Sequence, residues 1–262
     1  MIEEPYRWVE AIANRREYIE DQLRRGSPIV LVNYADGLLL LTVSRETRKV
    51  FEIYDRIGFA ALGHPADIER MRLIAIDLAH MEGFNRAVND VSLRRLVSFG
   101  MSPALKGAFE QVYGAPLIVK MLLAELGDDP EHDALVKLDY DGSLGRSEIE
   151  MKEPFEVLAG TSEAEKQMLN FLVDNNGNPR RSLDDALRLA ARTWAIGMET
   201  AERAGQAESE DAKTEEIDAV KTLKEHLKAR HVEAAVLDRA RPVTARFRLL
   251  DDKEIRSALK DL

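Results

Sequence analysis

Ser27 is a candidate nucleophile because of its place at the start of the first predicted strand. It stands between Gly26 and Pro28, directly before the apolar run 29–34. A cut after Gly26 would free the α-amino group of Ser27, which could then act as the base that activates the serine hydroxyl. Lys49 could lower the pKa of this group as a nearby cation. The chemistry would be that of a self-processing peptidase or amidohydrolase.

Three features of the same region oppose that chemistry. The run Thr42-Val43-Ser44-Arg45, at the end of the second predicted strand, offers no acid to support a catalytic base. Pro28 stiffens the backbone beside the candidate nucleophile. The residues before Gly26 also have the pattern of a well-formed helix rather than of a disposable leader. A catalytic and a non-catalytic interpretation of Ser27 therefore both remain open.

Other signatures of catalysis or metal binding are missing from the sequence. Because the chain has no cysteine, disulfides and thiolate metal sites are excluded. No phosphate-binding loop, dinucleotide-binding loop or Gly-x-Ser-x-Gly motif occurs. We therefore expect no metal and no cofactor. No zinc-binding or metalloprotease spacing links the five histidines, which are His64, His80, His132, His226 and His231.

Composition excludes several classes of partner. The 262 residues are 45% hydrophobic, which is enough to fill a core, and the formal net charge of −10 repels a phosphate backbone. No apolar run reaches membrane-spanning length, and the start at Met1 lacks the pattern of a secretory signal. We expect a cytoplasmic chain with neither a nucleic acid nor a membrane as partner.

The elements around Ser27 follow from hydrophobic periodicity. A helix is predicted from Pro5 to near Gly26. Its single apolar stripe consists of Trp8, Ile12, Ile19 and Leu23. Two strands, 29–34 and 38–43, follow as a hairpin whose turn is Ala35-Asp36-Gly37, and Asp-Gly is expected to supply positive φ angles.

The remaining strands come in blocks and the helices come in pairs. Capping signatures predict helices at Ser162, at Ser182 and at Asp251 with Glu254. Because a regular alternation of strand and helix is absent, the sheets should be largely antiparallel. The fold class is α+β, a four-layer α-β-β-α sandwich. Further strands are predicted over 50–54, 57–62, 117–126, 135–140, 155–158, 232–237 and 243–250, and further helices over 67–82 and 91–111.

One segment does not fit this packing. Between Glu199 and Asp218 there are eight acidic and two basic residues and almost no large apolar group, so we expect a solvated loop. With the charged stretch that follows, it makes an insertion over 199–231. No linker interrupts the chain, which is predicted to be a single domain over 1–262 with the helix and an end segment at 1–25.

The sequence resembles a bacterial proteasome α-type subunit, a non-catalytic member of the N-terminal-nucleophile hydrolase fold. The resemblance runs from about the first helix to about Pro242. The residues that carry it are Gly26-Ser27, the strand 29–34 with its Asp36-Gly37 turn, the run 49–63 with Tyr54-Asp55-Arg56, the turn Tyr140-Asp-Gly-Ser143, and the run 234–242.

The resemblance implies a function without catalysis by this chain. Such subunits form heptameric rings that cap β-type rings in a threonine-type endopeptidase complex. They gate the entry of unfolded protein substrates and receive a ring-shaped AAA ATPase. The alternatives are the self-processing enzyme that uses Ser27 and a stand-alone binding scaffold.

The resemblance also implies roles for particular residues. Lys49 matches the lysine that receives the C-terminal carboxylate of the ATPase, and Gly26 matches a small residue of that pocket. Arg24 and Arg25 are expected to make the surface near Lys49 locally positive. The apolar stripe Trp8, Ile12, Ile19 and Leu23 is expected to form part of the ring interface. The gate is expected at Met1, Ile2, Glu3, Glu4, Pro5 and Tyr6.

Overall fold

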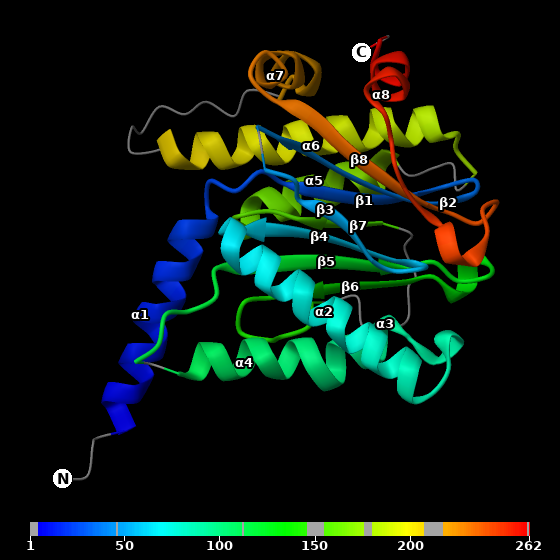
Figure 1. Cartoon of the computed structure of the whole chain (residues 1–262). Coiled ribbons are helices and arrows are strands. Elements are labelled where there is room, and N and C mark those ends of the chain that lie inside the picture. Colours follow the sequence, from blue (N-terminus) through cyan, green and yellow to red (C-terminus); the bar gives the residue numbers. More distant parts are fainter. Residues whose placement is uncertain are drawn as a thin grey trace.

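A computed structural model of the chain describes residues 5–45, 47–111, 113–145, 155–175, 180–206, 217–260 and 262. Two stacked sheets lie between two layers of helices, so the expected α-β-β-α sandwich is confirmed (Figure 1). All named strand pairs are antiparallel.

The first sheet has the strand order β7-β1-β2-β8-β9 and the second has the order β3-β4-β5-β6. The strands of the first sheet are β1 (Ile29–Tyr34), β2 (Gly37–Ser44), β7 (Phe155–Leu158), β8 (His231–Asp238) and β9 (Phe247–Leu249). Those of the second sheet are β3 (Val50–Tyr54), β4 (Ile57–Gly63), β5 (Val119–Glu125) and β6 (Ala134–Leu138).

Helices cover the outer face of each sheet. Over the second sheet lie α2 (Pro65–Asn85), α3 (Leu93–Leu96) and α4 (Ser102–Glu110), with a π-helical turn at Val97–Met101. Over the first sheet lie α5 (Ser162–Asn175) and α6 (Leu183–Gln206), and α7 (Ala219–His226) and α8 (Asp252–Leu259) pack on α6. Short 3-10 turns occur at Val88–Asp90, Pro130–His132 and Val243–Ala245. No described helix is both long and apolar enough to span a bilayer.

Three apolar clusters fill the spaces between the four layers. Neighbouring leucines of β2 point to opposite faces of the sheet, because side chains alternate along a strand. Leu39 packs toward α5 and α6, and Leu40 packs toward the second sheet. The lack of polar alternation in β2 follows from this burial on both faces.

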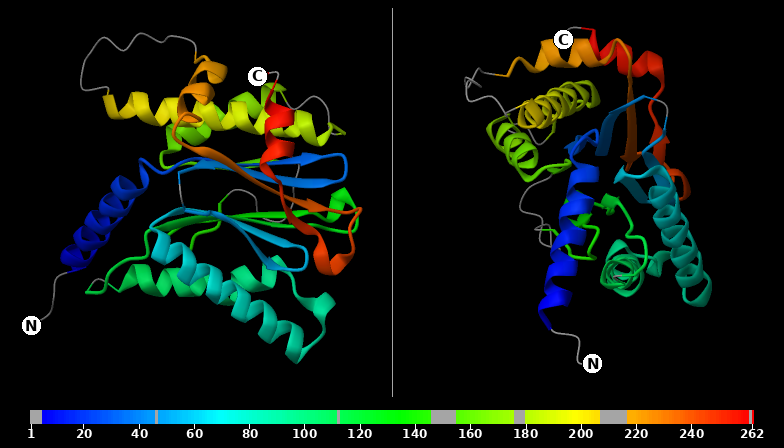
Figure 2. Two further views of the ribbon diagram at one scale, coloured as in Figure 1. Left: turned by 45° about the horizontal axis from the view of Figure 1, so that its top comes forward. Right: turned by 90° about the vertical axis from the view of Figure 1, so that its left-hand side faces the viewer.

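Helix α1 (Pro5–Leu23) lies across one end of the sandwich, apart from both helical layers (Figures 1 and 2). Its C-terminal end enters the space between the sheets, where Ile19 and Leu23 join the central cluster. The helix ends where the amide of Gly26 donates to the carbonyl of Leu23 at 2.8 Å. The main chain then continues into β1, so Ser27 sits at the junction of helix and sheet.

Two local predictions were wrong. Glu199–Gln206 is not a loop but the last part of α6, where Glu199 pairs with Arg203 at 2.9 Å and accepts a hydrogen bond from Thr222 of α7. The rest of the predicted acidic loop, 207–216, lies outside the described residues. In the turn between β1 and β2, neither Asp36 nor Gly37 has a positive φ. Glycine is needed there because a Cβ at Gly37 would lie 1.9 Å from the carbonyl oxygen of Leu237.

Candidate functional site

The apolar stripe of α1 is split between the interior and the surface. Ile19 and Leu23 are 0% and 1% exposed within their own domain, whereas Trp8 at the other end of the helix is 52% exposed. Ile12 lies between these extremes. Ile19 and Leu23 therefore have no surface left for a partner, and within the predicted stripe only Trp8 and Ile12 keep surface that a neighbouring subunit could contact.

Ser27 is buried and fully engaged in structural hydrogen bonds. Its Oγ donates to the carbonyl oxygen of Val43 at 2.6 Å and accepts the indole N–H of Trp194 at 2.9 Å. Only 7% of the residue is exposed. Because the hydroxyl proton is directed to a carbonyl oxygen rather than to a base, this geometry joins α1, β2 and α6 and does not prepare a nucleophile.

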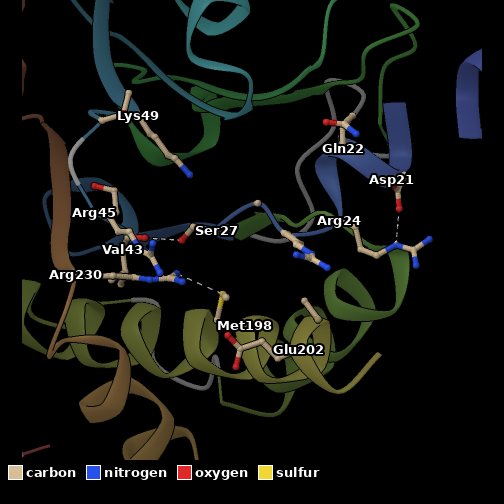
Figure 3. A pocket seen from close by; sticks show the side chains of 15 residues that line it. Asp21, Gln22, Arg24, Ser27, Val43, Arg45, Lys49, Met198, Glu202 and Arg230 are labelled. Atoms are coloured by element: carbon tan, nitrogen blue, oxygen red, sulfur yellow. Dashed lines mark hydrogen bonds and ion pairs between the residues drawn. The ribbon is translucent and has the colours of Figure 1, made fainter. Parts of the chain in front are cut away.

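An open pocket of about 1220 Å³ lies where α1, β2, α6 and the start of β8 meet (Figure 3). Predicted residues Gly26, Ser27 and Lys49 are brought together in it, with Arg24 and Arg25. Its other lining residues are Asp21, Gln22, Val43, Ser44, Arg45, Thr47, Met198, Ala201, Glu202 and Arg230.

Lys49 is positioned through its backbone by a buried carboxylate. Glu233 of β8, 8% exposed, accepts the amide of Lys49 at 3.0 Å on both oxygens and the amide of Val50 at 2.8 Å. Burial lowers the pKa of Lys49, while Glu233 raises it and Arg230 lowers it further. In the described part of the chain, the ammonium has no hydrogen bond or ion pair within 4.0 Å. Lys49 is therefore a positioned cation available to an anion from outside.

Gly26 lines the pocket and is small for a packing reason. A Cβ at this position would lie 2.6 Å from Cγ of Leu62 in β4. The glycine therefore lets the end of α1 approach the second sheet closely. This contact, together with the bond to Leu23, accounts for Gly26 even without a ligand.

Arg45, Arg230 and Glu202 were not identified from the sequence. Arg45 directly follows β2 and Arg230 directly precedes β8, and the pairing of Ser44 with His231 makes them the next opposed positions. Their separation along the chain hides this proximity, and only the strand register could have revealed it. Glu202 faces them from α6, where His226 of α7 pairs with it at 3.4 Å.

A set of polar contacts fastens the middle of α1 to the body of the protein. The hydroxyl of Tyr140 donates to Oε1 of Glu20 at 2.8 Å, and Arg16 pairs with Asp141 at 3.4 Å. The guanidinium of Arg15 donates to the carbonyls of Ala108 and Gly114, each at 2.9 Å. The Tyr140-Asp141 turn noted in the sequence thus holds the helix whose last turn forms one wall of the pocket.

The predicted gate falls mostly outside the described residues. Met1, Ile2, Glu3 and Glu4 are not described, and Pro5 and Tyr6 form the first turn of α1. The gate therefore stays a prediction. As for metals, no group of three or more His, Cys, Asp or Glu in the described ranges is arranged to hold an ion.

The chain is similar to curated proteins named proteasome subunit alpha, although no family model matches it. The relative from Actinosynnema mirum is 34% identical over 254 residues, which cover 95% of this chain and 84% of the relative. The relative from Streptomyces coelicolor is 30% identical, and the match covers 91% of this chain and 82% of the relative. The relative from Geodermatophilus obscurus is 32% identical, and the match covers 94% of this chain and 77% of the relative.

Proposed function

This chain belongs to the proteasome α-subunit family, and from that premise we propose that it forms the non-catalytic outer ring of a proteasome core particle. The ring is a heptamer of this chain, stacked on a ring of β-type subunits that supply threonine-type endopeptidase activity in the cytoplasm. It controls the entry of unfolded proteins and docks a ring-shaped AAA ATPase. The names of the relatives support the subunit class, and the pocket supports the docking role.

The absence of catalysis by this chain is supported by the setting of Ser27. Its hydroxyl is held by Val43 and Trp194, and the residue continues from α1 through Gly26. Intact-mass measurement of the purified chain tests this directly. We expect no loss of the residues before Ser27, and a product that begins at Ser27 and cleaves peptides alone would contradict the proposal.

The observation that carries the docking proposal is Lys49 in its pocket. Its ammonium is partly desolvated, and Arg230 stands close enough to repel it. A terminal carboxylate entering the pocket would give the ammonium a partner, and hydrogen bonds between charged groups are among the stronger ones in proteins. Asp21 and Gln22 of the last turn of α1 lie across the pocket from Lys49 (Figure 3), so the position of α1 sets the width of the pocket.

Docking is tested with the C-terminal ten residues of the AAA ATPase encoded in the same genome, prepared as the free acid and as the amide. We expect Lys49→Gln to weaken binding of the acid about tenfold or more, because a hydrogen bond to a charged group contributes about 1.5–3 kcal/mol. Lys166→Gln, on an exposed position of α5, is the matched control. Equal binding of the acid and the amide to the wild-type chain would overturn the docking role.

The gate is proposed at Met1, Ile2, Glu3, Glu4, Pro5 and Tyr6, at the free end of α1. Core particles assembled from β-type subunits and a chain lacking residues 2–4 should degrade an unfolded protein faster than wild-type particles do. Hydrolysis of a tripeptide small enough to pass a narrow opening should change little. Unchanged degradation of the unfolded protein would place the barrier elsewhere.

A further inference from the structure

The pocket around Lys49 carries more positive charge than one terminal carboxylate needs. Five basic and two acidic side chains line it, a surplus of three positive charges in a chain whose formal net charge is −10. The basic residues are Arg24, Arg25, Arg45, Lys49 and Arg230, and the acidic residues are Asp21 and Glu202. In Figure 3, Lys49, Arg45 and Arg230 lie on one side of the pocket and Arg24 on the other.

Arg45 and Arg230 are available to a ligand. Within the described ranges neither has an acidic partner at 4.0 Å or less, and the recorded hydrogen bond of Arg230 goes to Sδ of Met198 at 3.8 Å. Sulfur of this kind is a weak acceptor. Burial lowers the pKa of Arg230, Arg45 lowers it further, and Glu202 raises it. The two guanidinium groups therefore repel each other across the pocket wall, and an anion between them would relieve that repulsion.

The pairing of β2 with β8 in the first sheet brings Arg45 and Arg230 near each other. Arg45 directly follows β2 and Arg230 directly precedes β8, each next to a member of the paired Ser44 and His231. The charge of Arg45 acts on Arg230, so the two guanidinium groups lie near each other. Each could bind a carboxylate through two parallel hydrogen bonds.

The size and walls of the pocket favour a peptide end over a small anion. Its volume of about 1220 Å³ exceeds what a single carboxylate or phosphate fills. Val43, Met198 and Ala201 add apolar surface between the charged groups. The cations also come from separate elements, so they match charges that are spread along a chain rather than gathered on one atom.

Resting on the proposed docking function, we propose that Arg45 and Arg230 form a second carboxylate subsite beside Lys49. The pocket then takes a C-terminal chain end that carries an acidic side chain within a few residues of its terminal carboxylate. Lys49 binds the terminal group, and the two arginines bind the side chain. Glu202, on the opposing helix, disfavours an acidic ligand and so limits its affinity.

The test uses four versions of one eight-residue peptide, with Glu or Gln two residues before the end and with a free or an amidated terminus. We expect Glu to tighten binding to the wild-type chain about fivefold, the size of a partly exposed ion pair. This preference should vanish in Arg45→Gln/Arg230→Gln and persist in Lys49→Gln. Arg192→Gln/Lys166→Gln, at exposed positions of α6 and α5, removes the same two positive charges elsewhere and is the control for the change in net charge.

Glu202→Gln provides a second variant, at a half-exposed side chain, and should tighten binding of the Glu peptide. If the terminal carboxylate matters but Glu and Gln peptides bind equally, the second subsite is wrong and the docking function stands. If the amide binds as well as the acid, the docking function itself fails. A preference for Glu that survives in the double arginine variant would also overturn the assignment.

Discussion

Lys49 is the residue at which burial and charge bear most directly on the proposed docking function. Burial removes water from the ammonium and lowers its pKa, Glu233 opposes this shift, and Arg230 adds to it. A lysine with a lowered pKa loses its charge at a lower pH than an ordinary lysine does. The protonated form is the one that attracts a carboxylate, so the pocket should lose affinity as the solution becomes alkaline.

We therefore expect the affinity for a peptide with a free terminal carboxylate to fall between pH 7 and pH 10. The fall should begin at a pH below about 10.4, which is the pKa of an unperturbed lysine. Fluorescence anisotropy at constant ionic strength measures it. Lys49→Arg is the control, because a guanidinium stays charged over this range. If Lys49→Arg shows the same fall in affinity, the titrating group is not Lys49.

A second prediction for a single residue concerns Glu233 and the stability of the folded chain. The carboxylate accepts three amide contacts from Lys49 and Val50 in a buried position. Glu233→Gln replaces one accepting oxygen by an N–H₂ group that faces donors. We expect a loss of about 1.5–3 kcal/mol in the free energy of unfolding, measured by urea denaturation. Glu202→Gln serves as the control and should leave the midpoint nearly unchanged, and equal midpoints for both variants would contradict the anchoring role of Glu233.

At the scale of elements, α1 is the part of the fold that links packing to the pocket. Ile19 and Leu23 of its C-terminal half are buried between the sheets, and its last turn forms one wall of the pocket. The contacts of Arg15, Arg16 and Glu20 hold the middle of the helix and its last turn in place. The orientation of this helix therefore determines the distance between Lys49 and Arg24, which follows the helix on the opposite side of the pocket.

Tyr140→Phe should loosen this attachment with little change in packing. The variant keeps the ring and removes only the hydroxyl that donates to Glu20. We expect a loss of about 0.5–1.5 kcal/mol, seen as faster amide hydrogen exchange confined to α1. Tyr18→Phe, at an exposed tyrosine of the same helix, removes the same group without a partner in the described structure. Identical exchange of α1 in both variants would show that the hydroxyl of Tyr140 does not hold the helix.

Local patterns were sufficient to predict most elements but not how they meet. The capping box at Asp251 and Glu254 and the cap at Ser182 are present as expected, because each depends on residues a few positions apart. At α5 the capping hydroxyl belongs to Thr161, one residue before the predicted Ser162. The extension of α6 past Glu199 was missed, because a partner on α7 stabilises it.

The candidate site was also predictable only in part, because some of its residues meet through contacts between distant segments of the chain. Lys49, Gly26, Arg24 and Arg25 were identified through a resemblance that places them near one another, and the structure brings them into one pocket. Arg230 reaches the pocket only through the pairing of β2 with β8, which joins segments far apart along the chain. The hydrogen bond between Trp194 and Ser27 depends on the packing of α6 over the first sheet. No local pattern encodes such contacts.

At the scale of the whole molecule, the burial of α1 decides which residues can test ring assembly. A charge at Leu23 would unfold the protein, because this side chain lies in the central cluster. Loss of rings in such a variant would say nothing about an interface. Trp8 is the informative position, since it is 52% exposed and borders a small groove with Ile12 and Phe109 at the junction of α1 and α4.

Trp8→Glu should weaken the ring and leave the subunit folded. Exposed aromatic residues that become buried at an interface often contribute 2 kcal/mol or more, so the concentration needed for assembly should rise about thirtyfold. Sedimentation velocity across a dilution series measures this change, and urea denaturation of the subunit verifies its stability. Val173→Glu, at an apolar side chain of α5 that is 58% exposed, introduces the same charge on another face. If both variants assemble as the wild-type chain does, the Trp8 end of α1 is not part of the interface, and the ring must close through surfaces of the sandwich itself.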